Sequence, residues 1–407
     1  MKSQAKAPLW QKLLTAFLAS LCCFIPAELL CRVTYPPNPA GRGPQGLASH
    51  PLLNHVWPPN TSSLRAEYAN GDVPAYWMRI NAQGWREDDD VQQPKPQGTI
   101  RVFYLGDSFV EGTCEEEDCL PTRVERALQP TLRRHGMKIE MVNCGTRSHS
   151  PFLYYLLFKH YVLPLQPDLA VVNVDMTDVF DDHLYGKFAR YEPDGTLAAC
   201  PPNAGFRAEY VATAEGIERK PFSLRLREFI TEHSRFAEIL TLPVQYLGVE
   251  QRPTVDGRSG QPDPSQPLPE RFAWCAAQWT TETEQRVRQS MQALRDLVRL
   301  AKANQIRVAV TGVPHLGHFR GWFSERPFHE IRAVCAAEGV PYIDSYGGIQ
   351  KLLGDKSAEP IYIAGDMHFR DEGYRLWAQV QTEALLDPRN GLLPREVLAE
   401  RNRLAGW

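Results

Sequence analysis

The sequence predicts an α/β fold, a three-layer sandwich in which a five-stranded parallel sheet lies between two layers of helices. Short runs of apolar residues alternate with longer segments that have the spacing of amphipathic helices. Strands that are apolar on both faces are typical of a parallel sheet covered by helices on both sides. An N-terminal membrane helix and a long insertion are expected in addition to this sandwich.

Five runs have the strand pattern and five segments have the helix pattern. The predicted strands are 99–105, 138–143, 168–174, 307–311 and 341–344. The predicted helices lie around 119–135, 151–163, 281–304, 325–338 and 371–386. Because strands and helices alternate, the strands are expected to run parallel.

The composition is that of an ordinary globular protein. Of 407 residues, 43% are hydrophobic and 23% are charged, which excludes collagen, a coiled coil and wholesale disorder. The 45 basic and 48 acidic side chains give a net charge of −3, so no nucleic-acid partner is expected.

The N-terminal residues predict export. Lys2, Lys6 and Lys12 precede an apolar stretch, residues 13–30, whose 18 residues are near the lower limit for spanning a bilayer. We interpret residues 1–32 as a signal anchor or transmembrane helix, favoured over a cleaved signal peptide. The membrane is then a partner, and the rest of the chain is periplasmic or at the cell surface.

The remaining chain divides into three predicted parts. Residues 33–98, rich in proline and glycine at their start, are expected to form a stalk and an N-terminal extension. Residues 99–390 form the α/β domain, and 391–407 a C-terminal tail. An insertion at 183–280 has an amphipathic segment and a polar loop, and is expected to shape a substrate site.

Six cysteines follow the N-terminal segment. Cys114 and Cys119 bracket an acidic stretch, so a local disulfide is plausible in an oxidising compartment. The pairing of the others stays open. No C-x-x-C pair occurs, and His315 and His318 lack a third ligand in register, so no metal site and no cofactor are predicted.

Groups suited to acyl transfer follow the predicted strands, at the edge where a parallel sheet binds its ligand. Ser108 follows the first strand, and His368, with Asp366 two residues before it, precedes the last helix. A serine hydroxyl needs a base to accept its proton, and a carboxylate orients that base. The Ser108 and Gly145 amides and the Thr177 hydroxyl are candidate donors to an oxyanion.

These residues carry a family resemblance. Gly106-Asp107-Ser108-Phe109, Gly145, Thr177-Asp178 and Asp366-x-His368 resemble, in order, the four blocks of the SGNH/GDSL hydrolase superfamily. The preceding Asn81-Ala-Gln-Gly84-Trp-Arg86 is similar to the entry of its membrane-anchored bacterial members. The resemblance implies a flavodoxin-like sandwich. It also implies a Ser108 nucleophile, a triad completed by His368 and Asp366, and an oxyanion hole of Ser108, Gly145 and Thr177. Thr177 stands where the family has asparagine.

The predicted function is therefore that of an extracytoplasmic serine esterase. Its substrate would be an acyl ester, with acetyl and a carbohydrate as the expected acyl group and alcohol, on a small molecule or a polysaccharide. Two alternatives stay open: an O-acetyltransferase acting on envelope polysaccharide, and a non-catalytic SGNH-like binding or scaffold domain. The sequence does not identify the natural donor, the acceptor or the oligomeric state.

Overall fold

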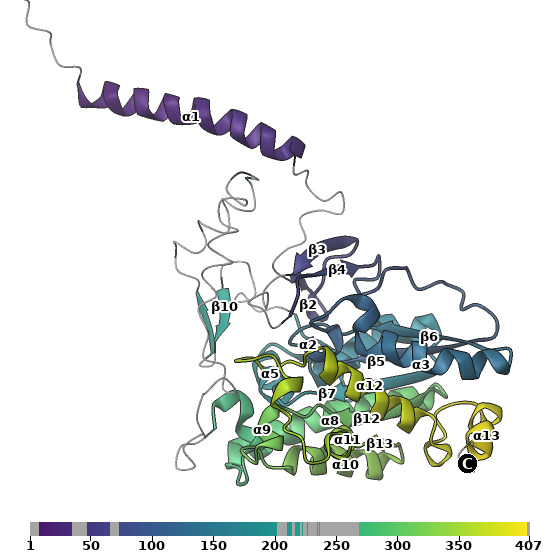
Figure 1. Cartoon of the computed structure of the whole chain (residues 1–407). Helices are drawn as coiled ribbons and strands as arrows, with labels where there is room; N and C mark the ends of the chain where they lie inside the picture. Colours follow the sequence, from purple (N-terminus) through teal and green to yellow (C-terminus); the bar gives the residue numbers. More distant parts are fainter. Residues whose placement is uncertain are drawn as a thin grey trace, which may run out of the picture.

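A computed structural model describes residues 8–34, 47–65, 73–201, 210–213, 216–219, 222, 226, 234, 236 and 268–404 (Figure 1). Its centre is a five-stranded sheet, which confirms the predicted α/β class. The strands are β5 (Thr99–Leu105), β6 (Lys138–Asn143), β7 (Leu169–Val174), β12 (Arg307–Gly312) and β13 (Tyr342–Ile343).

All pairs in this sheet are parallel, and the spatial order is β13-β12-β7-β5-β6. Numbered along the chain, the order is 2-1-3-4-5, which is the flavodoxin-like order. In such sheets the ligand crevice lies at the carboxyl ends of the two strands where the order reverses, here β5 and β7. The topology therefore directs attention to the residues that follow these two strands.

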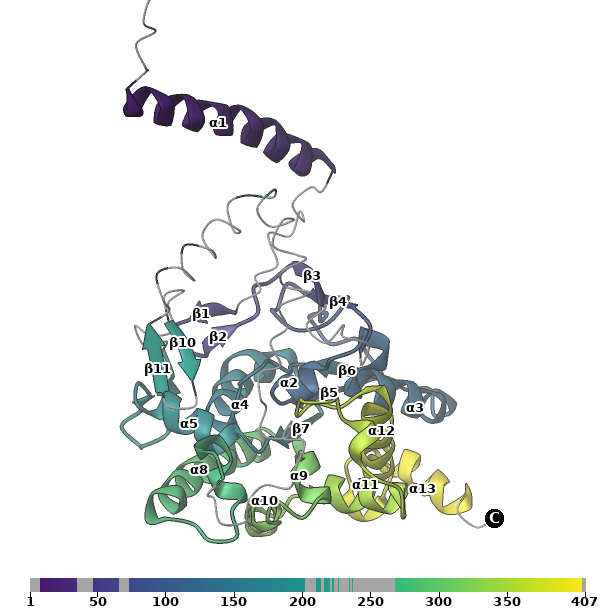
Figure 2. The same cartoon turned by 60° about the vertical axis from the view of Figure 1, so that its left-hand side comes forward.

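Alternate side chains of the strands enter two separate cores, as the two-residue period of a strand requires. Phe103 and Leu105 of β5 belong to the core under α4, α8 and α10, whereas Val102 and Tyr104 belong to the core under α3, α11 and α12. Figure 2 shows these two helical layers on opposite sides of the sheet. The predicted three-layer sandwich is confirmed.

Five helices of the two layers lie close to their predicted positions. Their bounds are α3 (Leu120–Arg134), α4 (Pro151–Leu157, continued by a π-helical turn at Phe158–Val162), α8 (Thr281–Ala303), α10 (Arg326–Glu338) and α12 (Asp371–Leu385). A sixth helix, α11 (Ser345–Leu353), was not predicted. Shorter helices are α2 (Ser108–Glu111), α5 (Asp178–Gly186) and α9 (Leu316–Phe319). The predicted tail contains α13 (Arg395–Leu404), whose Val397 and Leu398 are buried in the core of α3 and α12.

The N-terminal extension packs on the domain. It forms two antiparallel hairpins, β1 (Ala48–His50) with β2 (Asn54–Val56), and β3 (Thr61–Arg65) with β4 (Tyr76–Ile80). Trp57 and Met78 form a small core with Ile363, which precedes the loop of His368. Trp85 enters the main core against Phe103 of β5. These residues of the extension thus support the sheet and the loop before α12.

The N-terminal segment forms a single helix, α1 (Leu9–Thr34). In the part of the chain that the structure describes, no helix is both long and apolar enough to cross a membrane. The predicted membrane helix is therefore not supported. Within α1, the apolar run 13–30 contains one charged residue, Glu28, which pairs with Arg32 at 2.6 Å.

Only parts of the predicted insertion are described. After α5, the hairpin of β8 (Arg190–Tyr191) and β9 (Leu197–Ala199) and the pair β10 (Tyr210–Thr213) and β11 (Gly216–Arg219) precede a 3-10 turn at Glu270–Cys275. Most of the predicted amphipathic segment, 222–240, and of the polar loop, 250–270, lies outside the described residues.

Candidate active site

Three of the predicted site residues form one hydrogen-bonded chain at the carboxyl edge of the sheet. The Nε2 atom of His368 lies 2.7 Å from the Ser108 Oγ atom, and Nδ1 of the same ring is hydrogen-bonded to Asp366. With Nδ1 directed at a carboxylate, the neutral ring carries its proton there, which leaves Nε2 as an acceptor for the serine hydroxyl.

Ser108 is held by the tight turn between β5 and α2. Asp107 caps α2, because its carboxylate accepts the Phe109 amide at 3.0 Å. A Cβ atom at Gly106 would lie 2.2 Å from a methyl carbon of Val110, so the turn needs glycine at that position. Ser108 is therefore the first residue of a helix, where a backbone amide has no acceptor within the helix.

His368 is held by a short loop that closes on itself before α12. The Ile363 amide donates to the His368 carbonyl at 2.9 Å, and Gly365 takes a positive φ of 74° within the turn. The imidazole lies against the Phe109 ring, with centroids 4.9 Å apart. The base is thus oriented by its own loop and by the residue that follows the serine.

Asp366 has the electrostatics of an orienting carboxylate. Burial by itself would raise its pKa, but attraction and hydrogen bonding from His368 hold the pKa of Asp366 below its usual value. Its side chain is 20% exposed and that of His368 11%, so both are reachable from outside. An ionised Asp366 favours the proton on Nδ1 and stabilises the imidazolium that forms when Nε2 accepts a second proton.

The other two predicted donors lie at this edge but are engaged within the protein. The Gly145 amide donates to Oδ1 of Asn143 at 3.0 Å. The Thr177 hydroxyl donates to Oδ2 of Asp175 at 2.8 Å, as does the Thr177 amide. Either group would have to release its present acceptor before it could donate to a substrate oxygen.

A second histidine–carboxylate pair lies behind the first. Nε2 of His315 lies 2.6 Å from Oδ1 of Asp175, and both side chains are completely buried. Burial opposes ionisation of Asp175, but His315 and Thr177 lower its pKa. His318 instead contacts the His315 backbone, and burial lowers the pKa of His318 to about 3. The two histidines of the His315-x-x-His318 pattern thus form hydrogen bonds within the protein interior.

Buried carboxylates are concentrated beside the serine. Oxygens of Asp107, Asp175 and Asp178 lie within 4.8 Å of one another. Burial and the mutual repulsion of these groups raise the pKa of Asp107 and of Asp178 well above the usual value, because a buried negative charge beside another is costly. The raised pKa values favour the protonated, neutral form of Asp107 and Asp178.

The two cysteines of the predicted local disulfide lie close together as thiols. Their sulfur atoms are 3.8 Å apart, and both side chains are buried. The Arg86 guanidinium donates to the carbonyls of Glu111, Gly112 and Cys114, and so ties this segment to the extension. The geometry places the two cysteines as neighbours without a covalent bond.

Sequence reasoning missed an ion pair between a buried carboxylate near Ser108 and a partly exposed arginine. Glu111, at the end of α2, binds Arg147, which follows β6, at 2.7 Å. The available signal was the acidic residue one helical turn after the serine, together with an arginine two residues after Gly145. Nothing in the local pattern shows that these two residues meet.

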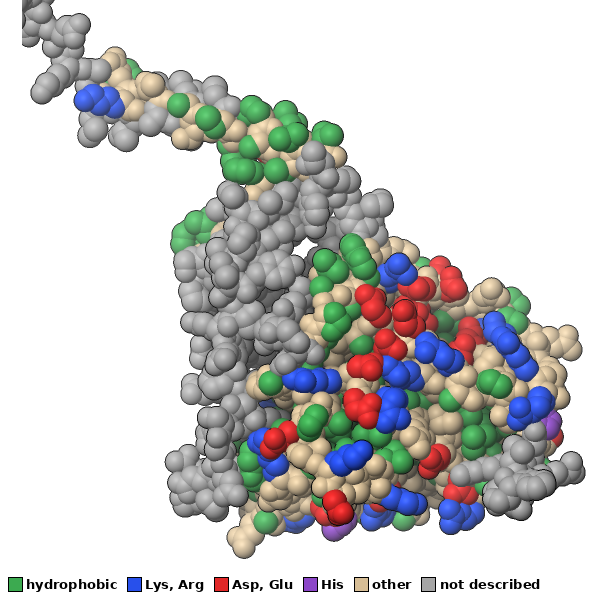
Figure 3. All heavy atoms as spheres, in the orientation of Figure 1, with side chains coloured by type: hydrophobic (Ala, Val, Ile, Leu, Met, Phe, Trp, Pro, Cys, Tyr) green, Lys and Arg blue, Asp and Glu red, His purple; other side chains and the backbone are tan. Residues whose placement is uncertain are grey.

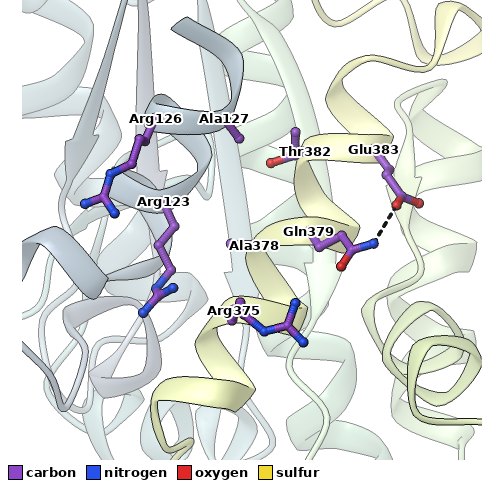
Figure 4. A pocket seen from close by; sticks show the side chains of 8 residues that line it. All are labelled: Arg123, Arg126, Ala127, Arg375, Ala378, Gln379, Thr382 and Glu383. Carbon is purple, nitrogen blue, oxygen red and sulfur yellow. Dashed lines mark hydrogen bonds between the residues drawn. The ribbon is translucent and has the colours of Figure 1, made fainter. Parts of the chain in front are cut away.

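A surface groove between α3 and α12 lies apart from the hydrogen-bonded chain. Figure 4 shows it lined by arginines of both helices, together with Gln379, Thr382 and Glu383. Arg123 pairs with Asp118 and Asp371, and Arg375 pairs with Glu372. On the face seen in Figure 3, acidic and basic side chains are interspersed, and no single charge dominates.

Comparison with known proteins gives structural neighbours only. No family model and no curated protein matches the sequence. The chain is similar to solved lipases and acetyl esterases.

Three of these solved structures illustrate the likeness. A lipase/acylhydrolase from Enterococcus faecalis is 12% identical, with a TM-score of 0.36, over 70% of this chain and 94% of its own. A GDSL-like lipase from Parabacteroides merdae is 12% identical, with a TM-score of 0.39, over 72% and 96%. An acetyl-xylooligosaccharide esterase from Geobacillus is 10% identical, with a TM-score of 0.38, over 70% and 93%.

Proposed function

We propose that this protein is a serine esterase of the SGNH/GDSL type. The observation that carries the proposal is the 2.7 Å contact between His368 Nε2 and Ser108 Oγ, with Asp366 on the opposite nitrogen of the ring. A nucleophile within hydrogen-bond reach of a base, itself oriented by a carboxylate, is the arrangement that acyl transfer needs.

In the proposed reaction, Ser108 Oγ attacks the ester carbonyl carbon and its proton passes to Nε2 of His368. The carbonyl oxygen becomes an oxyanion beside the Ser108 amide. Collapse of this intermediate breaks the ester C–O bond, and the departing alcohol oxygen takes the proton from His368. Water then attacks the acyl-serine by the same sequence, which releases the acid and restores Ser108.

The Ser108 amide is the proposed principal donor of the oxyanion hole, because it lies at the first position of α2. The Gly145 amide and the Thr177 hydroxyl are proposed as further donors. Each joins only if it releases Asn143 or Asp175, respectively. Hydrolysis by this chain is thus proposed to depend on one donor that is ready and two that need a local rearrangement.

For the substrate we propose an acyl ester with a short acyl group, acetyl, and a carbohydrate as the alcohol. The family resemblance of the four blocks supports this choice, and esterases for acetylated xylo-oligosaccharides are among the structural neighbours. The acyl group is tested by comparing the rate of hydrolysis of p-nitrophenyl acetate with that of p-nitrophenyl octanoate. Acetate release from an acetylated xylo-oligosaccharide tests the alcohol.

Location outside the cytoplasm is proposed from the N-terminal lysines and the apolar run that follows them. The full chain fused at its C-terminus to a reporter enzyme that is active only after export tests this. Reporter activity is expected, and its absence from a stably produced fusion would contradict the proposal.

The catalytic proposal is tested by p-nitrophenyl acetate hydrolysis with the wild type, Ser108→Ala and Ser357→Ala. Ser357 is an exposed serine between α11 and the loop of His368, and it serves as the matched control. We expect Ser108→Ala to lose hydrolysis above the background rate and Ser357→Ala to keep it. Equal rates for the wild type and Ser108→Ala would remove the proposal.

A further inference from the structure

Glu111 lies at the end of α2, three residues after Ser108, and its side chain is almost completely buried. One carboxylate oxygen accepts the indole Nε1 of Trp57 at 2.8 Å and the backbone amide of Arg147 at 2.9 Å. The other accepts the Arg147 guanidinium at 2.7 and 3.3 Å. This carboxylate therefore joins the helix of the serine, the loop after β6 and the N-terminal extension.

The loop after β6 touches α2 directly at this point. A Cβ atom at Gly145 would lie 2.1 Å from the Glu111 amide nitrogen and 2.5 Å from the Val110 carbonyl carbon. No side chain fits between the two backbones, so a shift of α2 must be transmitted to the loop. The side chains of Glu111 and Arg147 join the same two segments, α2 and the loop after β6, by an ion pair.

The network around Glu111 is charged. Burial by itself would raise the pKa of Glu111, but attraction and hydrogen bonding from Arg147, with contributions from Arg65 and Trp57, hold it below its usual value. The guanidinium groups of Arg147 and Arg65 lie over the Trp57 ring, 5.0 and 5.5 Å from its centre. The carboxylate is ionised and is bonded on both oxygens.

We propose that Glu111 is a positioning residue for ester hydrolysis. Its ion pair with Arg147 holds α2 against residues 145–147 and so sets the separation between the Ser108 hydroxyl and the Gly145 amide. The inference rests on the proposed function and deepens it. Through Trp57, the N-terminal extension becomes part of the support of the active site.

Such a role has a kinetic signature, because a displacement of about 1 Å at a reacting group can lower a rate about 100-fold. Glu111→Gln keeps the shape of the side chain and removes its charge. We expect the rate constant for fluorophosphonate labelling of Ser108, and kcat for p-nitrophenyl acetate, to fall about 10- to 100-fold with KM unchanged.

Rates are expressed per reactive Ser108, counted by labelling carried to completion. A merely structural role for Glu111 lowers the melting temperature and the number of reactive chains, but leaves the rate per reactive chain as it was. The per-site rate thus separates positioning from folding.

Two further variants make the experiment independent of one substitution. Arg147→Gln removes the same ion pair from its partly exposed side, and a similar per-site loss is expected. In the double variant the two losses should not add, because both remove one interaction. Glu140→Gln is the control: it breaks the 2.6 Å ion pair with Arg101 of β5, away from α2, and should keep the per-site rate.

Per-site rates of Glu111→Gln and Arg147→Gln within twofold of the wild type, with Ser108→Ala unreactive, would overturn the positioning role and leave the esterase proposal intact. If Glu111→Gln does not fold, Arg147→Gln decides by the same criterion. A wild type that neither labels nor hydrolyses would overturn the esterase proposal and the inference with it.

Discussion

The ring nitrogen Nε2 of His368 lies 2.7 Å from Ser108 Oγ, although the two residues are 260 positions apart in the sequence. The contact exists because β5 and the loop before α12 end at the same edge of the sheet. Ser108 follows β5, which is one of the two strands between which the strand order reverses. The topology of the sheet thus creates the meeting of nucleophile and base.

Asp366→Asn tests the orienting role of the carboxylate. An amide at this position is expected to accept from Nδ1 less well and to stop stabilising the imidazolium. Hydrolysis of p-nitrophenyl acetate should fall about 10³- to 10⁴-fold while the fold is kept, as circular dichroism would show. A loss of less than tenfold would mean that the Asp366 contact with His368 does not serve the reaction.

Gly145→Ala tests the close approach of the loop to α2. The added carbon would lie 2.1 Å from the Glu111 amide nitrogen, so one backbone has to move. We expect a loss of about 1–3 kcal/mol in the free energy of unfolding, measured in urea, and slower labelling of Ser108. Gly186→Ala is the control, since its added carbon would be 3.5 Å from the Phe152 ring. Equal stability of the two variants would contradict this packing.

Thr177→Val tests whether the threonine hydroxyl serves as an oxyanion donor. The hydroxyl donates to Asp175 in the structure, and the proposed role requires that it turns toward the substrate oxygen during the reaction. Because loss of a working oxyanion donor costs about 10²- to 10³-fold, the rate of Ser108 labelling should fall by that factor. A fall of less than tenfold would contradict the donor role of Thr177.

Asp182→Asn tests the buried carboxyl beside α4. Burial raises the pKa of Asp182 to about 7, although hydrogen bonds from Ser150 and the Phe152 amide lower it in part. Between about pH 4 and 7 the folded chain keeps a proton that the unfolded chain has lost, so the free energy of unfolding falls as pH rises and levels off above pH 7.

The variant should reduce this slope by up to about 1.4 kcal/mol per pH unit and be more stable than the wild type at pH 8, as urea titrations at several pH values would show. Parallel pH profiles for the two proteins would contradict the raised pKa.

Much of the fold follows from local patterns. The strand 99–105 was predicted at its observed bounds, because a continuous apolar run between a proline-rich segment and a glycine has few alternatives. The last strand, predicted over 341–344, is observed at Tyr342–Ile343, which pair with Val310 and Thr311 of β12. The predicted membrane helix is not supported, because no helix in the described part of the chain is both long and apolar enough to cross a membrane.

Less of the site was predictable. Ser108 could be found because it follows a predicted strand, and Asp366 and His368 because they precede a predicted helix. The Asp175–His315 and Glu111–Arg147 pairs join segments with no common pattern, so only the folded chain reveals them. The same holds for Thr177, whose hydroxyl is bonded to a neighbouring carboxylate that the sequence did not single out.

The most direct test of the account is labelling by a fluorophosphonate probe, which reacts only with an activated serine. We expect one label for each wild-type chain, attached to Ser108 when the modified peptide is sequenced, with no labelling of Ser108→Ala and greatly slowed labelling of His368→Ala. An unlabelled wild type, or equal labelling of the wild type and Ser108→Ala, would contradict the assignment of Ser108 as the nucleophile.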